Sequence, residues 1–390
     1  MKNSSEISEK PSEKSSLQKL SESITEKISN VSRMGYCSST SSKVFSLNDL
    51  PDEILLKIFL SLPPKELGRC LQVSKRFNQI AKDEKLWQNI RIWNKFRRRK
   101  GISAKFFSQA LNYGLENLSL RRCVVTGNLE SPDMTQLKSL YLKWMNFYKG
   151  DNREFVSNMF ENCQFLQRLF IHGRGSSKLD FQRITLNGHS LKVVNIYFHQ
   201  DRFRVWWTQA SLSLNLEIVK LIVDNCTELS ELALSNISQE AVEYLCQNLT
   251  PNICKLHLDC RAKIDFYLPT KNIKILSSRF DKLTALSIIS IRISKVAVRY
   301  VKTLANLEKL ALSQWDEELT VWIDDMAEMS KLKLLCIDSF FGTKRQLKQM
   351  CEQRLAHLEN LTVLFDGVKI VEFGYQKKLM DIAMPDKNRW

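Results

Sequence analysis

The feature that most constrains the fold is a short apolar pattern that recurs ten times between residues 115 and 363. Each copy has one apolar residue, two others, a second apolar residue, one other, and a third apolar residue. The copies begin at Leu115, Leu137, Leu166, Leu191, Leu229, Ile253, Leu283, Leu307, Leu332 and Leu358. Most starts lie 22 to 30 residues apart, a period typical of repeat proteins.

The spacing inside each copy predicts a short strand. The second and third apolar residues are two apart, so they point to one side, and the residue between them points to the other. Segments between copies, such as 153–160 and 239–245, have the pattern of amphipathic helices. The pattern therefore predicts an α/β fold: a curved solenoid of about ten strand-helix units with a parallel sheet on its concave face. It resembles leucine-rich repeats.

A second region, Ser46 to Ile90, has a different character. Its first helix is expected to begin at Pro51 and is apolar around most of its circumference. The polar residues Glu53, Lys57 and Ser61 are spaced by four and form one narrow stripe. Such a helix must be buried on more than one side, and about 45 residues are too few to enclose it. The exposed remainder predicts a partner protein.

Two further short helices are expected after Pro63-Pro64, with Ser74 as the N-cap of the second. The whole stretch resembles the F-box family, through Leu50-Pro51, Asp52-Glu53-Ile54-Leu55, Ile58-Phe59, Leu62-Pro63, Val73-Ser74-Lys75-Arg76-Phe77 and Leu86-Trp87. The resemblance implies a small three-helix domain that binds a Skp adaptor. It also implies the adaptor-facing residues: Leu50, Pro51, Ile54, Leu55, Ile58, Leu62, Leu67, Val73 and Trp87.

The F-box resemblance further implies a function. Such chains are substrate-recognition subunits of SCF-type cullin-RING ubiquitin ligases, in which the repeats hold the target protein for ubiquitination. We expect no catalytic residue, cofactor or metal site: the five histidines are scattered, and neither an HExxH nor a GxSxG motif occurs. The alternatives are a non-catalytic leucine-rich-repeat scaffold and an anionic-ligand or nucleic-acid binding protein.

Composition supplies the expected domain organisation. Residues 1–43 are rich in Ser, Lys and Glu and predict a disordered tail. The expected order is then the F-box at 44–92, a basic linker at 93–114, the solenoid at 115–370 and a C-terminal tail at 371–390. Ten cysteines without a CxxC pair or a signal peptide favour a cytoplasmic or nuclear location and no membrane. The cysteines are expected to act as small buried hydrophobic residues.

The outward strand positions predict where a target would bind. In the first four repeats these positions are basic and aromatic: Arg121, Tyr141, Lys143, Arg168, Phe170, His172 and Tyr197. In later repeats they are small, neutral or mildly acidic. The first group suits an acidic or phosphorylated peptide; alternatively, it only follows the net charge of +16. An insertion at 199–208 with Phe203, Trp206 and Trp207 predicts either a binding loop or a plug in the core.

Overall fold

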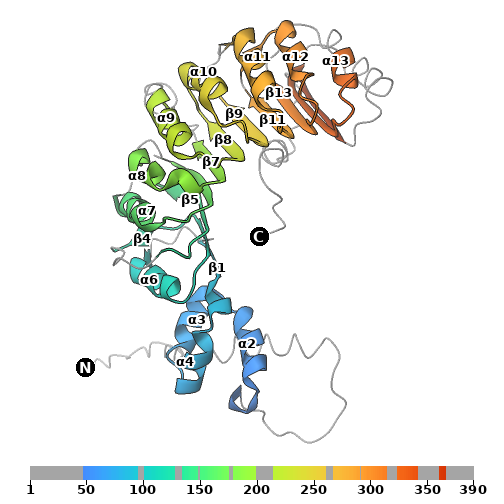
Figure 1. Cartoon of the computed structure of the whole chain (residues 1–390). Coiled ribbons are helices and arrows are strands. Elements are labelled where there is room, and N and C mark those ends of the chain that lie inside the picture. The colour runs from blue at the N-terminus through green and yellow to red at the C-terminus, as the bar shows by residue number, and fades with distance from the viewer. Residues whose placement is uncertain are drawn as a thin grey trace, which may run out of the picture. The chain divides into compact units, whose positions relative to one another are not determined.

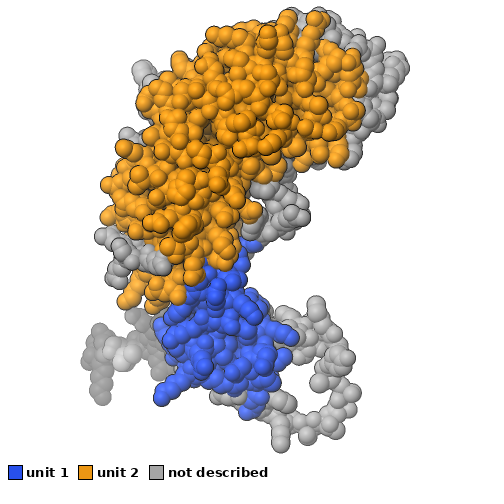
Figure 2. All heavy atoms as spheres, viewed as in Figure 1, with its two compact units in different colours: residues 1–91, 113–115 blue, residues 92–112, 116–390 orange. Residues whose placement is uncertain are grey.

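The computed structural model describes residues 47–94, 101–127, 134–147, 150–174, 179–198, 214–260, 267–289, 291–313, 323–340 and 360–365. The chain divides into two compact units, residues 1–91 with 113–115 and residues 92–112 with 116–390 (Figure 2). The predictions for the tail at 1–43, the basic run at 95–100, the insertion at 199–208 and the tail at 371–390 lie outside the described residues.

The first unit is a small helical bundle. It contains a 3-10 turn η1 (Leu47–Asp49) and the helices α2 (Asp52–Leu60), α3 (Pro64–Cys70), α4 (Lys75–Ala81) and α5 (Glu84–Trp87). Helix α2 begins one residue later than expected, with Pro51 as its N-cap. The predicted cap of α4 is confirmed, because the Ser74 side chain accepts a hydrogen bond from the backbone N–H of Phe77. Each short helix thus has a local start signal in the sequence.

Aromatic side chains form the core of this unit. Phe59 of α2 packs edge-on against Phe77 of α4, with ring centroids 5.3 Å apart. Trp87 is fully buried, and its Nε1 donates to the carbonyl of Ala81 at 2.7 Å. Its ring also lies 5.2 Å from that of Tyr113. The bundle therefore buries its largest residues and satisfies the single indole donor.

The second unit is built on one long parallel sheet. Its strand order is β1-β3-β5-β6-β7-β8-β9-β11-β13-β14-β15. These strands are β1 (Asn89–Trp93), β3 (Asn117–Arg121), β5 (Ser139–Asn146), β6 (Arg168–Arg174), β7 (Val193–Phe198), β8 (Glu231–Ser235), β9 (Lys255–Asp259), β11 (Ala285–Ile289), β13 (Lys309–Ser313), β14 (Leu334–Phe340) and β15 (Asn360–Phe365). All ten predicted strands are present, and β1 is an additional strand at the start.

Helices alternate with these strands and cover one side of the sheet, so the strands line the inner side of the arc (Figure 1). They are α7 (Gly150–Asn162), α8 (Phe181–Leu186), α9 (Leu216–Asn225), α10 (Gln239–Asn248), α11 (Thr270–Arg279), α12 (Lys295–Val301) and α13 (Ile323–Ala327). The repeat leucines align across the strands, for example Leu118 with Leu140 and Leu140 with Leu169, and they are buried. This ladder is the core of the predicted leucine-rich-repeat solenoid, which the structure confirms.

The segment expected to be a basic linker, 93–114, contains regular structure. Strand β2 (Ile102–Ser103) pairs with β4 (Val125–Thr126), and helix α6 (Ala104–Asn112) follows. Ala104, Phe107 and Ala110 are buried on one side of α6. The basic residues at the start of this segment led to the linker prediction, although the apolar residues that follow have the spacing of a helix. A second short pair joins β10 (Tyr267–Leu268) to β12 (Arg292–Ile293).

Candidate protein-binding surfaces

Helix α2 exposes apolar side chains on both flanks of its buried face. Leu55 and Phe59 point into the bundle. At 3.6 residues per turn, Ile54 lies on one side of that face and Leu60 on the other. Ile54 is 39% exposed and Leu60 is 54% exposed. Fully burying an exposed side chain of this size contributes about 1.5–3 kcal/mol. Covering the part of Ile54 and Leu60 that is still exposed would supply a fraction of that, so these flanks favour a covering partner.

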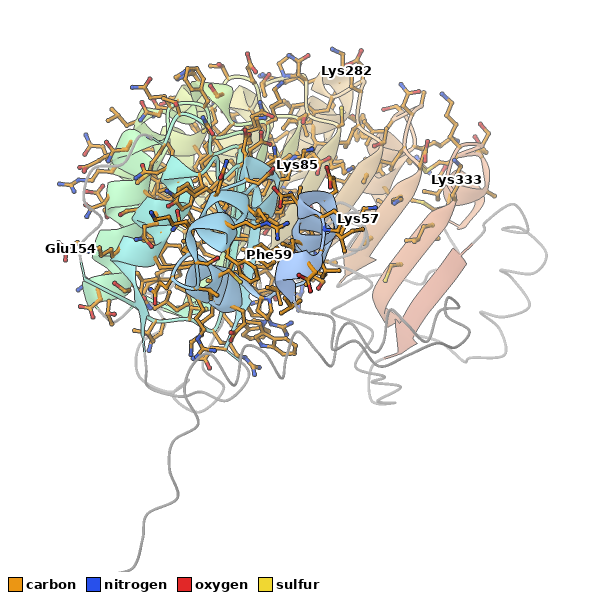
Figure 3. The ribbon with its side chains drawn as sticks, turned by 90° about the horizontal axis from the view of Figure 1, so that it is seen from below. Lys57, Phe59, Lys85, Glu154, Lys282 and Lys333 are labelled. Carbon is orange, nitrogen blue, oxygen red and sulfur yellow. The ribbon has the colours of Figure 1, made fainter. Side chains whose placement is uncertain are left out.

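The polar stripe lies opposite the buried face of α2. Glu53, Lys57 and Ser61 are all exposed, and Lys57 and Phe59 project to different sides of the helix (Figure 3). Arg76 of α4 secures the start of α2: it bonds Asp52 Oδ1 at 2.6 Å and donates to the Leu50 carbonyl. The helix is thus held in place by one ion pair and its buried face, which leaves the two apolar flanks accessible.

The nine predicted adaptor-facing residues divide into two groups. Leu50, Pro51, Ile54, Ile58 and Val73 are exposed or partly exposed. Leu55, Leu62, Leu67 and Trp87 are buried within the bundle, so their contribution to a partner is indirect: they hold the helices that carry the exposed group. Leu60 was not among the predicted residues, although its place on the flank of α2 follows from the helical period.

The concave face of β3–β7 forms a second candidate surface. The residues predicted to bind a target share this face in the strand register: Arg121 pairs with Lys143, Lys143 with His172, and His172 with Tyr197. Two residues earlier on the same strands, Tyr141 pairs with Phe170. Their rings stack with centroids 4.3 Å apart and planes 14° apart. The structure therefore brings the predicted cluster together.

Two tryptophans that were not predicted extend this cluster. Trp93 of β1 is half exposed, and the Arg121 guanidinium lies over its ring at 4.7 Å. Trp144 lies at an irregularity of β5, where the register shifts between Lys143 and Met145. This bulge breaks the alternation that would have placed Trp144 on the core side. Its ring lies 4.4 Å from that of His172.

Backbone strain accompanies the bulge. Trp144 has φ 58°, and Arg122, at the equivalent position after β3, has φ 56°. Bulky residues rarely adopt this left-handed conformation, which costs on the order of 1–2 kcal/mol. The equivalent position after β8 holds Asn236 with φ 55°, and asparagine tolerates it better. The Arg122 guanidinium lies 5.9 Å from the centre of the Trp144 ring, so the two residues with left-handed backbones also face each other through their side chains.

Burial and charge act together on Tyr141. Burial raises the pKa of its hydroxyl, and the positive charge of the nearby Arg168 opposes that shift. The hydroxyl is therefore neutral at physiological pH. On the same sheet, His257 Nδ1 lies 2.8 Å from Ser287 Oγ, but Ser287 is completely buried. This pair is a structural contact of the later strands.

The predicted role of the cysteines is confirmed at the ends of three helices. Burial raises the pKa of Cys163, Cys226 and Cys246 to about 12, so these thiols stay protonated and unreactive. Within the described ranges, no group of three or more His, Cys, Asp and Glu side chains could hold a metal ion. No helix in the described part of the chain has the length and apolarity to cross a bilayer.

Comparison with known proteins identifies the helical unit. The family model described as F-box-like matches residues 47–93. "F-box protein dre-1" of Caenorhabditis elegans is 48% identical over 44 residues, 11% of this chain and 5% of the relative. "F-box/LRR-repeat protein 5" of Mus musculus is 46% identical over 44 residues, 11% of this chain and 6% of the relative. "F-box/WD repeat-containing protein 8" of Homo sapiens is 54% identical over 41 residues, 10% of this chain and 7% of the relative.

Two solved structures have a broad but weak likeness. An internalin from Listeria monocytogenes has a TM-score of 0.38 and 14% identity, covering 78% of this chain and 89% of its own. The Rad7 and Elc1 complex of yeast has a TM-score of 0.32 and 13% identity, covering 94% of this chain and 100% of the matched one. These scores are too low to add to the fold described above. The class follows from the family match and the sheet: the chain carries an F-box-like domain followed by a leucine-rich-repeat solenoid.

Proposed function

We propose that this chain is the substrate-recognition subunit of an SCF-type ubiquitin ligase complex. In this role the helical unit binds a Skp-type adaptor, the adaptor joins the chain to a cullin, and the repeats bind the protein to be ubiquitinated. The observation that carries the proposal is a coincidence on one helix. The F-box-like match at 47–93 contains α2, whose apolar flanks remain exposed in the isolated chain.

Proximity is the chemical contribution of such a subunit. A target held by the repeats brings its lysines close to a ubiquitin-conjugating enzyme carried by the same complex. Tethering converts a bimolecular encounter into an intramolecular one and raises the effective concentration, to the millimolar range for short flexible links. The receptor needs no catalytic group of its own for this effect. It needs one surface for the adaptor and another for the target.

The test is adaptor binding by the full chain. We expect the wild-type chain, co-expressed with a Skp1-type adaptor, to elute with it as one complex in size-exclusion chromatography. Ile54→Asp combined with Leu60→Asp places two charges on the apolar flanks of α2 and is expected to abolish co-elution. Leu186→Asp is the matched control, because Leu186 lies on α8 of the other unit and is 67% exposed.

Two outcomes would contradict the proposal. A folded wild-type chain that does not co-elute with the adaptor removes its basis. Equal co-elution of wild type and the double variant would show that the adaptor does not use the flanks of α2. Circular dichroism of each variant checks that the helices are retained, since Ile54 and Leu60 are both exposed and their replacement leaves the core of the bundle unchanged.

A further inference from the structure

Positive charges are placed side by side on the concave face. Arg121 and Lys143 are direct register partners on β3 and β5, and neighbouring strands lie about 4.8 Å apart. Like charges directly opposite each other destabilise a sheet. Arg122 follows immediately and is exposed. Three cations in adjacent positions favour an anion, whose binding would relieve their repulsion.

Aromatic rings, rather than carboxylates, hold two of these cations. The Arg121 guanidinium lies over Trp93 and that of Arg122 near Trp144. Among the described residues, neither arginine forms an ion pair with an acidic side chain. Stacking on a ring occupies the face of a guanidinium and leaves the N–H edge to other partners; in Arg121 the Nε of this edge is buried and has no hydrogen-bond partner. That edge has the geometry for a bidentate contact with an anionic group.

Positive charge is neutralised where the sheet continues beyond β7. Lys255 of β9 forms an ion pair with Glu231 of β8 at 2.6 Å, and both side chains are mostly buried. The concave positions of β11 are all buried. Arg121 and Lys143 lie instead on β3 and β5, where alternate residues are still partly exposed.

The aromatic residues of the same face favour a peptide over a nucleic acid. Single-stranded nucleic acids bind by stacking their bases on aromatic faces. Tyr141 and Phe170 already stack on each other, and Phe170 is buried. His172 and Tyr197 also contact each other, with ring centroids 5.0 Å apart. These rings present a packed wall, which suits apolar side chains of a peptide better than inserted bases.

We propose that the concave face of β3–β7 binds an extended acidic segment of the target protein. This inference deepens the proposed function and rests on it, because the bound segment belongs to a target protein only if the chain is a substrate receptor. Carboxylates of the segment contact Arg121, Arg122 and Lys143, and an apolar side chain packs against Tyr141 and the rings beside it. Three strand spacings separate β3 from β7, about 14 Å. An extended segment of about four or five residues spans that distance.

The probe is a short fluorescein-labelled peptide of repeating Glu-Ala-Glu-Leu, measured by fluorescence anisotropy with the full chain bound to its adaptor. Three further probes have the same length: the peptide with Gln for Glu, the peptide with phosphoserine for Glu, and single-stranded oligothymidine. The variant Arg121→Gln with Lys143→Gln removes two charges from the face. The matched control, Lys105→Gln with Lys271→Gln, removes two exposed charges from helices α6 and α11.

We expect the Glu peptide to bind the wild type and the Gln peptide to bind at least about tenfold more weakly. Loss of charge-assisted hydrogen bonds should lower the affinity of the face variant by about tenfold or more. The control variant should stay within about twofold of wild type, as two distant surface charges add little at physiological salt. These three results together support the proposal.

Four other results would overturn it. The first is no binding of the Glu peptide, and the second is equal binding by wild type and face variant. If only the phosphoserine peptide binds, the anion is a phosphate and the carboxylate assignment is wrong. If oligothymidine binds more tightly and loses affinity in the face variant, the surface is a nucleic-acid site. Adaptor co-elution is recorded for every sample. An intact adaptor complex that does not bind the peptide refutes this inference and leaves the proposed function standing.

Discussion

The concave faces of β3 and β11 differ although both strands carry the inner apolar residues of the repeat, Leu118 and Leu120 in β3 and Leu286 and Ile288 in β11. In β3 the outward residues Asn117, Ser119 and Arg121 are partly exposed, in strict alternation with the buried ones. In β11 all five residues are buried. The inner positions fix the repeat and its curvature, and they are nearly constant. The outer positions are free to differ, so they determine which part of the solenoid can meet a partner.

Side-chain size follows the same division. The first strands carry cations and rings, whereas the later ones carry Ala233, Ser287 and Ala311 at outward positions. These later residues are buried despite pointing away from the helices. Ala285, Ile289, Ala311 and Cys336 form a compact apolar cluster there. Outward positions that are already buried offer little area to a ligand, whereas β3 and β5 keep partly exposed ones.

The largest expected effect comes from placing an arginine on each face. Ser119 and Ser287 occupy the same row of the register. In Ser287→Arg the charge must enter a buried site and break the contact with His257. We expect a loss of about 3 kcal/mol or more in the free energy of unfolding. Urea unfolding followed by circular dichroism measures it.

Ser119→Arg is the matched substitution on the partly exposed face. A surface change of this kind usually alters stability by less than about 0.5 kcal/mol, and the added charge should strengthen binding of the Glu peptide. Equal destabilisation by the two substitutions would show that the two halves of the sheet do not differ in accessibility. The two faces would then differ only in the chemical nature of their outward side chains.

The repeat pattern predicted the strands well because each strand depends on its own few residues. Leu118 and Leu120, for example, are two apart and both buried, so a local pattern was sufficient. Strand β1 was not predicted because it lacks the repeat pattern and was assigned to the helical region. The bulge at Trp144 was not predicted for another reason: it depends on a residue of the neighbouring strand. Gly173 on the neighbouring strand allows it, since a Cβ there would lie 2.5 Å from the Met145 carbonyl oxygen.

The helical surface was predicted in outline and less well in detail. The excess of apolar residues on α2 correctly indicated exposed apolar side chains, because a short segment cannot bury them all. Which residues are exposed depends on where α3, α4 and α5 pack. Trp87 and Leu67 resemble interface residues in sequence, yet the bundle needs them for its core. Only tertiary packing separates these two roles.

A smaller effect should come from the ion pair at the boundary between the two halves. Glu231→Gln removes the partner of Lys255 from a mostly buried site. We expect a loss of about 1 kcal/mol in the free energy of unfolding. Glu308→Gln is the control, since Glu308 meets Lys333 at 3.3 Å in a more exposed position, where a pair contributes about 0–1 kcal/mol.

The same variant tests how sharply the two halves are separated. Glu231→Gln leaves the positive charge of Lys255 without its carboxylate. If the later half is closed to ligands, the affinity for the Glu peptide should change by less than about twofold, because Lys255 is mostly buried and lies two strands beyond β7. A several-fold gain would mean that an acidic segment reaches β9, and the binding face would have to be extended beyond β7.

The smallest expected effect concerns the strained arginine. Arg122 holds a left-handed backbone conformation that Asn236 adopts at the equivalent position of β8. Arg122→Asn should relieve part of this strain and raise the free energy of unfolding by about 0.5 kcal/mol, after the loss of a weak exposed cation–π contact. The same change should weaken binding of the Glu peptide about threefold or more, because one guanidinium is lost. If the strain at Arg122 has no role in binding, Arg122→Asn would raise the free energy of unfolding and leave the affinity for the Glu peptide unchanged. A gain in stability with a loss of affinity is the expected sign that β3 retains an unfavourable backbone because its ligand requires the side chain.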